Sequence, residues 1–396
     1  MRQAPRVAVM GGSLGGITAA LVLRDVGCDV HVFERSSAAL EARGAGIAVL
    51  DATIRYFVEH DPGQVEKICS TTDWIRYLCP EGAVRHEEPR AYRFSSWNTV
   101  YRALLHFFDD PRYHLGAEVV GFDQDPESVR VHLNGGRTHV CDLLVCADGI
   151  SSTARSTLLP DVAPRYAGYV AWRGTLAEAV LSAATFARLR DAITYQLLPH
   201  SHILVYPIPT QEGAIEPGSR LMNFVWYRNV AAGADLDALL TDREGRRRTV
   251  SLPPGSAQQR HLDEMRTYAA THMAPPIAEV VGSAPEPFVQ VIFDIDVPAM
   301  AFNRVCLLGD AAFAVRPHAA AGTAKAAANA WALAEAVQAA DGNVPEALRL
   351  WEPSQLALGR QLLARTREIG NSSQFAQTPW TPGDPKLIFG LYAPGH

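Results

Sequence analysis

The fold of this chain is decided by residues 7–16, which read Val7-Ala8-Val9-Met10-Gly11-Gly12-Ser13-Leu14-Gly15-Gly16. The first four residues are apolar and predict a β-strand, and residues 17–23 have the composition of a helix. The glycines between them allow a sharp turn and let a pyrophosphate approach the helix N-terminus, where free N–H groups favour an anion. We therefore predict a dinucleotide-binding βαβ unit whose ligand-binding turn comprises Gly11, Gly12, Ser13, Leu14 and Gly16.

A carboxylate downstream of the turn supports this prediction. A second apolar run, residues 29–33, ends at Glu34, about twenty residues beyond the turn. Glu34 can accept both hydroxyls of an adenosine ribose and disfavours a phosphate on it, so FAD or NAD is expected rather than NADP. The middle position of the glycine pattern is Ser13, so the pattern alone leaves a glycine-rich turn without a ligand as the alternative.

Two later segments extend the evidence for a bound dinucleotide. Residues 141–146 predict a buried strand that leads into Asp148, and residues 304–308 predict another that leads into Asp310. A helix of small residues follows over residues 322–340. An aspartate beside a glycine after a strand is usually only a turn. The three segments in this order nevertheless point to one dinucleotide that is contacted along the whole chain.

Composition and charge indicate a large soluble enzyme. Of the 396 residues, 48% are hydrophobic and 20% are charged, and the formal net charge is −6, so we expect two lobes and neither nucleic acid nor a membrane as a partner. We see no membrane span, no signal peptide and no zinc-like spacing among the six cysteines, which predicts reduced thiols, no metal and a cytoplasmic location. The aromatic tail from Ser372 should pack on its own subunit or a neighbour, and a homo-oligomer is expected.

These segments resemble the class A flavoprotein monooxygenases, the family typified by para-hydroxybenzoate hydroxylase. The resemblance covers nearly the whole chain and includes particular strings at residues 166–169, 172–174, 206–209 and 316–322. It implies an α/β fold with a Rossmann-like FAD-binding domain of the glutathione-reductase type and an inserted mixed β-sheet domain for the substrate. The FAD-binding domain is expected at 1–75, 97–165 and 297–365, the substrate domain at 76–96 and 166–296, and a C-terminal tail at 366–396.

The resemblance also implies which residues contact FAD. Asp310 should bind the ribityl chain, and Asp148 should support the cofactor site. Arg43 should meet the pyrophosphate or adenine end, and Arg102 should reach the ribityl and pyrophosphate region, with a solvated cation as the alternative for each arginine. Further contacts are expected from Arg35, Gly322 and Thr323.

The activity implied by the resemblance is aromatic hydroxylation. In that family NADH or NADPH reduces the FAD, oxygen adds at the flavin C4a carbon, and the resulting hydroperoxide attacks an electron-rich ring. The string at 316–322 resembles the family's hydroxypyridine hydroxylases, with Phe313 where the general pattern has His. We therefore expect a small hydroxypyridine and O2 as substrates. Two roles stay open, hydroxylation of a pyridinol in a piericidin-like antibiotic pathway and hydroxylation of 2,6-dihydroxypyridine in pyridine catabolism.

The ring must be held and activated by loss of a hydroxyl proton, which suits a histidine. His202 and Tyr206 are four apart on a predicted strand and share one face, so His202 is the candidate proton acceptor, with an ordinary core histidine as the alternative. Tyr206 is favoured as a packing residue. His318 and Pro317 should lie near the flavin C4a carbon, and Arg316 should hold an anionic group or pair with a carboxylate.

Two other classes of function share the same FAD segments. A flavoprotein reductase would consume reduced nicotinamide without oxygen, and a non-enzymatic flavin sensor would bind FAD without substrate-stimulated oxidation. The chain carries no recognisable effector module, which disfavours the sensor. The string at 316–322 resembles hydroxypyridine hydroxylases rather than prenyl reductases, which disfavours the reductase.

Overall fold

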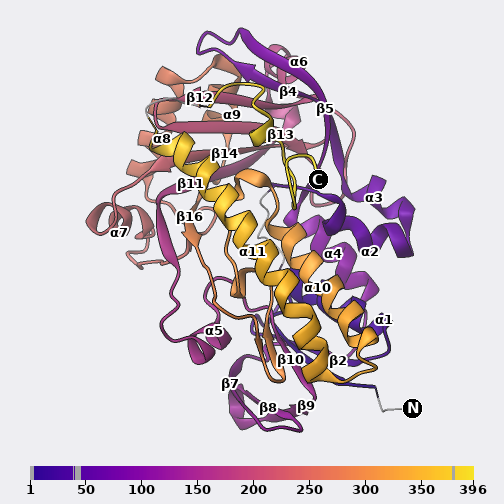
Figure 1. The fold of residues 1–396 in the computed structure, drawn as a ribbon. Helices are drawn as coiled ribbons and strands as arrows, with labels where there is room; N and C mark the ends of the chain where they lie inside the picture. The colour runs from indigo at the N-terminus through magenta and orange to yellow at the C-terminus, as the bar shows by residue number, and fades with distance from the viewer. Residues whose placement is uncertain (1–3, 39, 41–45, 377–379) are drawn as a thin grey trace.

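Two large sheets organise the molecule, and the computed structural model describes residues 4–38, 40, 46–376 and 380–396. One sheet has six strands and the other nine, and a third sheet of three strands lies beyond the six-stranded one (Figure 1). The nine-stranded sheet fills the upper lobe in Figure 1 and the six-stranded sheet the lower lobe. This α/β architecture with a separate mixed sheet confirms the predicted fold class.

The six-stranded sheet has the order β17-β18-β10-β1-β2-β6 and is parallel except for the β17–β18 pair. Its strands are Ala301–Phe302 (β17), Val305–Leu307 (β18), Leu143–Cys146 (β10), Arg6–Met10 (β1), Asp29–Glu34 (β2) and Tyr113–Leu115 (β6). The continuous apolar run of β1 suits a parallel sheet that is covered on both faces. Because β1, β10 and β18 are parallel, the three turns that follow them come to one edge of the sheet.

Helices cover one face of this sheet, and the three-stranded sheet packs on the other (Figure 1). Helix α1 (Leu14–Asp25) lies directly on the central strands, and α4 (Trp97–Phe107) and α10 (Gly322–Ala339) pack on α1. Helices α2 (Asp51–His60) and α11 (Val344–Gln374) pack on α10, and α3 (Pro62–Ile68) packs on α2. The small sheet consists of β7 (Val119–Gln124), β8 (Val129–Leu133) and β9 (Thr138–Cys141), and α5 (Thr153–Leu158) lies next to β7.

One expected strand is two strands in the structure. Residues 141–146 are divided between β9 and β10, and Asp142 separates them. The carboxylate of Asp142 accepts a hydrogen bond from the backbone N–H of Arg6 at 2.8 Å, which anchors the chain where it passes from the small sheet to the six-stranded sheet. The apolar run could not show this break, because Cys141 at the end of β9 and the residues of β10 are buried in the same core.

The nine-stranded sheet is mixed, with the order β15-β16-β11-β14-β13-β12-β4-β5-β3. Its strands are Ser251–Leu252 (β15), Phe288–Asp294 (β16), Arg165–Ala177 (β11), Leu221–Asn229 (β14), Ser201–Ile208 (β13), Ala192–Leu198 (β12), Ser70–Leu78 (β4), Val84–Ser96 (β5) and Gly46–Ala48 (β3). The β12–β4 pair is parallel, which joins a hairpin from early in the chain to strands from its middle. The nearby helices are α6 (Ala183–Leu189), α7 (Ala234–Leu240), α8 (Gln259–His272) and α9 (Pro275–Ser283).

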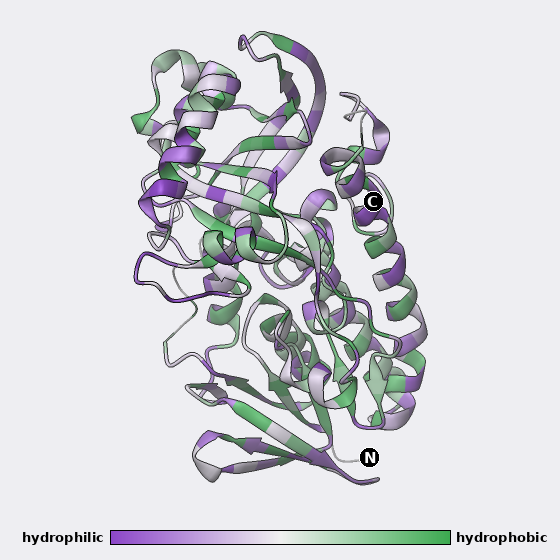
Figure 2. Cartoon of the chain, turned by 90° about the vertical axis from the view of Figure 1, so that its left-hand side faces the viewer, coloured by the Kyte–Doolittle hydropathy of each residue, from purple (hydrophilic) through white to green (hydrophobic). Residues whose placement is uncertain are grey.

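The two faces of this sheet form different cores, because successive side chains of a strand point to opposite sides. On one face, strand residues such as Val205 and Trp226 pack with Met265 of α8 and Ile277 of α9. On the other face, aromatic residues pack with Ile369 of α11 and with the C-terminal segment; they include Tyr169, Tyr195, Tyr206, Tyr227, Trp380 and Phe389. In Figure 2 the strands of both sheets carry the hydrophobic colouring in the interior.

Helix α11 joins the two lobes, since it packs on α10 at one end and on β13 and β14 at the other (Figure 1). Two expected boundaries are therefore wrong. Residues 366–374 belong to α11 rather than to a tail. Residues 46–48 and 70–75, expected in the FAD-binding domain, pair with the nine-stranded sheet as β3 and the start of β4. Both errors have one cause, because pairing partners far along the chain leave no local sequence signal.

Residues 228–260 contain regular elements as well as loops. They include α7, whose Leu239 and Leu240 are buried, and the short strand β15. Three arginines of this segment pair with nearby carboxylates, namely Arg246 with Glu244, Arg247 with Asp237 and Arg248 with Asp242. No helix among the described residues is long and apolar enough to cross a membrane.

Candidate cofactor and substrate site

The three predicted motifs touch one another at the carboxyl edge of the six-stranded sheet. Gly11 has φ +95°, and a methyl group on it would lie 2.7 Å from the carbonyl oxygen of Ala147, next to Asp148. A methyl group on Gly15 would lie 3.0 Å from the Cβ of Ala326 in α10, and one on Gly309 would lie 3.2 Å from the same atom. Small residues therefore let segments from the start, middle and end of the chain meet at one place.

The glycine turn presents the groups that an anion needs. Ser13 is the N-cap of α1 but makes no capping hydrogen bond with its side chain, and the first amides of a helix have no intrahelical acceptor. The turn is held in place by Glu34, which is buried and accepts hydrogen bonds from the backbone N–H of Gly12 and of Ser36, each at 2.9 Å. A carboxylate has lone pairs for further donors, so Glu34 can also accept ribose hydroxyls.

Asp148 and Asp310 follow β10 and β18 and have different partners. Asp148 accepts hydrogen bonds from Ser152 Oγ at 2.6 Å and Ala154 N at 3.3 Å, and burial raises the pKa of its carboxyl above the ordinary value. These hydrogen bonds connect Asp148 to the start of α5. Asp310 receives the buried Lys325 at 2.8 Å, while 44% of its side chain stays exposed. Both aspartates are partly exposed at this edge of the sheet, so either carboxylate can face a ligand.

The donor set and the buried polar atoms fit FAD. Gly322 and Thr323 begin α10, whose N-cap makes no side-chain hydrogen bond, so this second helix also offers free N-terminal amides. Asn98 in α4 is 1% exposed, and neither of its side-chain polar atoms has a hydrogen-bond partner. A buried amide group without partners is costly and marks a place where a polar ligand is expected.

The expected arginines are placed differently from one another. Arg102 lies in α4, one turn beyond Asn98, and donates a hydrogen bond to the backbone carbonyl of Gln211 at 3.0 Å, a partner that the sequence did not predict. Arg35 is exposed after the end of β2. Arg43 lies outside the described residues.

On the nine-stranded sheet, the structure brings His202 and His318 together. His202, Leu204 and Tyr206 share the aromatic face of β13, as the alternation of the strand predicts. The His202 ring lies 5.4 Å from the ring of His318 and 4.1 Å from that of Trp380, measured between centres. His202 Nδ1 bonds Ser373 Oγ at 2.5 Å, so the end of α11 holds this imidazole.

Burial keeps both imidazoles neutral. Burial lowers the pKa of His202 well below its ordinary value, and burial next to Arg316 lowers the pKa of His318 to about 3. An imidazole whose charged form is this unfavourable is a weak proton acceptor. Burial therefore counts against the expectation that His202 removes a proton from the ring.

The other three expected catalytic residues, Tyr206, Arg316 and Pro317, have different surroundings. Tyr206 donates a hydrogen bond to the Gly46 carbonyl at 2.9 Å and stacks on Phe94, so it holds β3 in place and does not relay protons. The Arg316 guanidinium binds both carboxylate oxygens of Asp294, at 3.0 and 2.9 Å, and is not free for an anionic ligand. Pro317 is exposed at the start of a short 3-10 helix, residues 317–319.

Sequence reasoning missed residues whose signal lies mainly in tertiary contacts. Lys325 had a local signal, because a lysine in an alanine-rich helix start is unusual and here it is 1% exposed. Arg155 is 2% exposed and ties Asp148's helix to the third motif through the Ala311 carbonyl at 3.0 Å. Asn98 had no signal apart from its place in α4, and Tyr169 lies in the string at 166–169, whose sequence did not indicate its contact with His318.

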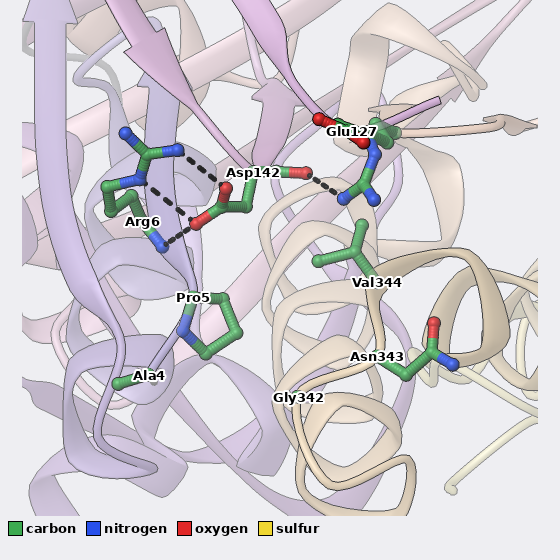
Figure 3. Close-up of a pocket in the computed structure, with 9 residues that line it drawn as sticks. Ala4, Pro5, Arg6, Glu127, Asp142, Gly342, Asn343 and Val344 are labelled. Atoms are coloured by element: carbon green, nitrogen blue, oxygen red, sulfur yellow. Dashed lines mark hydrogen bonds and ion pairs between the residues drawn. The ribbon is translucent and has the colours of Figure 1, made fainter. Parts of the chain in front are cut away.

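Two cavities among the described residues lie away from these motifs. The larger of these, about 710 Å³, is at the opposite, N-terminal end of β1 and β10, where Arg6 and Asp142 form an ion pair (Figure 3). The smaller, about 310 Å³, lies between α2, α10 and α11. Neither cavity is the substrate site that the motifs indicate.

Comparison with known proteins agrees with the geometry. A family model described as "FAD binding domain-like" matches residues 166–294. The chain is 37% identical to 2,6-dihydroxypyridine 3-monooxygenase of Paenarthrobacter nicotinovorans, over 98% of this chain and 96% of the relative. It is 27% identical to 3-amino-4-hydroxybenzoate 2-monooxygenase of Streptomyces cremeus, over 94% of this chain and 89% of that protein. The solved structure of 2,6-dihydroxypyridine-3-hydroxylase from Arthrobacter nicotinovorans superposes with a TM-score of 0.93 at 36% identity, covering 99% of this chain and 98% of that one.

Proposed function

Because this chain belongs to the class A flavoprotein monooxygenases, we propose that it hydroxylates an electron-rich hydroxypyridine ring with FAD, NADH or NADPH, and O2. One observation carries the proposal. The similarity to a 2,6-dihydroxypyridine monooxygenase spans 98% of this chain, so it includes both the cofactor motifs and the histidine-bearing sheet face. The predicted class of enzyme is supported by the two monooxygenases described above, and the flavin cofactor by the FAD-binding family model.

We assign the cofactor to the carboxyl edge of the six-stranded sheet. The first amides of α1 would bind the pyrophosphate, and Glu34 would accept the adenosine ribose hydroxyls. Asp310, fixed by its ion pair with Lys325, would bind the ribityl chain. Asn98 would use its unpartnered amide group on the same ligand. Bound FAD, once reduced by NAD(P)H, supplies the activated oxygen for the ring.

We assign the substrate to the aromatic face of the nine-stranded sheet. Tyr169, Tyr227 and Trp380 surround the two histidines with apolar rings, which would orient an aromatic substrate and exclude water. The neutral imidazoles would hydrogen-bond the ring oxygens. A hydroxypyridine that enters as its anion needs N–H donors there more than it needs a base.

The comparisons favour a monooxygenase over the flavin reductase and the flavin sensor, the two other classes considered from the sequence. A flavin reductase or a flavin sensor would have the same cofactor edge, but the relatives described above are monooxygenases. The choice between a catabolic hydroxypyridine and a pyridinol with a long substituent rests on the space at the aromatic face with ligands bound, so it is left to the substrate test.

The test is NAD(P)H oxidation by the FAD-loaded protein, with oxygen uptake and product mass recorded. The substrates are 2,6-dihydroxypyridine, a pyridinol with a long alkyl chain, and 3-amino-4-hydroxybenzoate as a benzenoid control. We expect one pyridine substrate to accelerate flavin reduction and to gain a single oxygen atom. Flavin reduction without oxygen in any product would overturn the proposal in favour of a reductase.

Self-association of the chain and its cellular location are two further proposals. We infer that copies of the chain associate, because Phe375 and Tyr392 in the C-terminal segment remain exposed at 48% and 57%. We infer a cytoplasmic location, because the six cysteines are free thiols and five of them are buried in the described core. Light scattering of the purified protein tests the first inference, and cell fractionation tests the second.

A further inference from the structure

Tyr169 and His318 form a buried pair whose hydrogen bond defines the state of the imidazole. The Tyr169 hydroxyl lies 2.7 Å from His318 Nε2, and both side chains are buried. The other ring nitrogen, His318 Nδ1, is also buried and has no hydrogen-bond partner among the described residues. A neutral imidazole carries one proton, so the partner of Nε2 decides what Nδ1 can do.

Two arrangements of the protons are possible, and they differ in cost. If Tyr169 donates to Nε2, the imidazole proton is on Nδ1, and this N–H is the single group of the Tyr169–His318 pair left without a partner among the described residues. If Nε2–H donates to Tyr169, the phenol proton has no acceptor within the described structure and Nδ1 is left as an unpaired acceptor. Burial raises the pKa of Tyr169, so the phenol keeps its proton in either case. The first arrangement leaves fewer buried groups unsatisfied and is therefore favoured.

The fold holds this pair tightly. Gly370 of α11 lies directly against it, and a methyl group there would be 2.5 Å from the Tyr169 hydroxyl and 2.9 Å from His318 Nε2. Ala320, two residues after His318, adopts φ +56°, a conformation that non-glycine residues rarely take. The neighbouring Arg316 lies 5.5 Å from the centre of the Tyr169 ring and is locked to Asp294. The left-handed backbone at Ala320 and the close contact with Gly370 fix the position of the His318 ring. Strained positions of this kind are concentrated at functional sites.

We propose that Tyr169 is a positioning residue that fixes His318 as its Nδ1–H tautomer, so that Nδ1–H donates to an ionised oxygen of the bound hydroxypyridine. The inference rests on the proposed function for the identity of the ligand, but the tautomer itself does not depend on it. His318 then serves as a hydrogen-bond donor and Tyr169 acts only through it. The site would select rings that carry an anionic oxygen next to the position of this N–H.

Binding by matched variants tests which nitrogen matters. The dissociation constant of 2,6-dihydroxypyridine is measured without oxygen from the change in flavin absorbance of the FAD-loaded protein. H318N keeps a polar group near the place of Nδ1 and H318Q keeps one near Nε2, so we expect H318N to bind close to wild type and H318Q to bind roughly tenfold or more weakly. Equal losses in both variants, with intact thermal unfolding, would overturn the role of Nδ1.

Tyr169 is tested against a tyrosine of the same strand. Y169F removes the donor to Nε2, so both tautomers of the neutral His318 imidazole become populated, and we expect binding to weaken by about fivefold. Y166F is the control, because the Tyr166 hydroxyl donates to the Val230 carbonyl at 2.9 Å, in a loop outside the aromatic face. Binding by Y169F that matches Y166F would overturn the proposal.

A spectroscopic measurement separates this proposal from the proposed function. Nitrogen-15 NMR of histidine-labelled, FAD-loaded protein without substrate reports which ring nitrogen of His318 is protonated, with H318N used for assignment. We expect Nδ1–H in the wild type and a mixture of tautomers in Y169F. Nε2–H in the wild type would overturn the proposal even if hydroxylation is observed, whereas Nδ1–H in a protein that hydroxylates nothing would leave the tautomer established and remove only the proposed function.

Discussion

The two sheets place their functional groups by different means. At the edge of the six-stranded sheet, each motif is a short local segment that follows one strand, and the segments meet because the strands are parallel. On the nine-stranded sheet, the site combines His202 from β13, Tyr169 from β11, His318 from a loop and Ser373 from the end of α11. The comparison teaches that the cofactor side is encoded locally, whereas the substrate side exists only once distant segments have packed.

The two regions also differ in how far their ionisable side chains are exposed. The cofactor edge keeps Asp310 at 44% exposure and offers helix N-termini, so it can receive a charged ligand without a large desolvation cost. The aromatic face is buried, with His202 at 1% and His318 at 6% exposure. Substitutions should therefore act on cofactor retention in one region and on stability and substrate binding in the other.

The largest effect is expected from Gly16→Ala at the cofactor edge. A methyl group on Gly16 would lie 1.8 Å from the backbone oxygen of Gly11, so the turn must open. We expect purified protein with background flavin content, measured by the ratio of flavin to protein absorbance. Gly282→Ala in α9 is the control, because nothing lies within 4 Å of the added methyl group and alanine favours helix. Full flavin content in Gly16→Ala would contradict the local encoding of this region.

On the substrate side, Asp294→Ala should cost the most stability. Asp294 is 6% exposed and binds Arg316 at 2.9 Å and Arg367 at 3.0 Å, so its loss leaves two arginines without their carboxylate. The free energy of unfolding should fall by about 3 kcal/mol, measured by urea denaturation of the FAD-loaded protein. The exposed pair of Glu346 and Arg349 is the control, and Glu346→Ala should not change the denaturation midpoint measurably. A loss no larger than the control's would show that β16, the 316–322 loop and α11 do not depend on one another.

Acid should destabilise the aromatic face through its histidines. His318 has its pKa lowered to about 3 from an ordinary value of 6.5, so below pH 6.5 the unfolded chain binds a proton that the folded chain does not. This contribution to stability is absent above pH 6.5 and grows more unfavourable by about 1.4 kcal/mol for each pH unit below it. Unfolding measured from pH 7.5 to 5 should show a shallower loss in His318→Asn. The exposed His200, at φ +51°, tolerates asparagine, and His200→Asn should keep the wild-type slope.

The smallest effect is expected at the cavity of about 710 Å³ on the N-terminal side of the six-stranded sheet (Figure 3). Arg6 and Asp142 form a half-exposed ion pair there, at 2.7 Å. Arg6→Ala should lower the free energy of unfolding by less than about 1 kcal/mol and leave flavin content and turnover unchanged. A loss of turnover in Arg6→Ala would show that the N-terminal end of the six-stranded sheet contributes to function, and not only its carboxyl edge.

Prediction from sequence succeeded where one segment carries both the structural and the chemical signal. The strand that ends at Glu34, the glycine turn and the run before Asp310 were each visible, because their periodicity and their glycines are local properties. The division between β9 and β10, the pairing of β3 with β5, and the extension of α11 to Gln374 were not visible. Each of these depends on a partner strand or a core far along the chain.

The sequence by itself determined the cofactor edge of this protein, since the spacing of glycines and carboxylates after apolar strands leaves few other folds. Only the tertiary structure decided the chemistry of the substrate side. It placed His202 against Ser373, gave His318 the Tyr169 hydroxyl as its partner, and assigned Arg316 to Asp294. The physical reason is that burial and hydrogen-bond partners set the protonation and tautomer of an imidazole, and both are properties of the packed core.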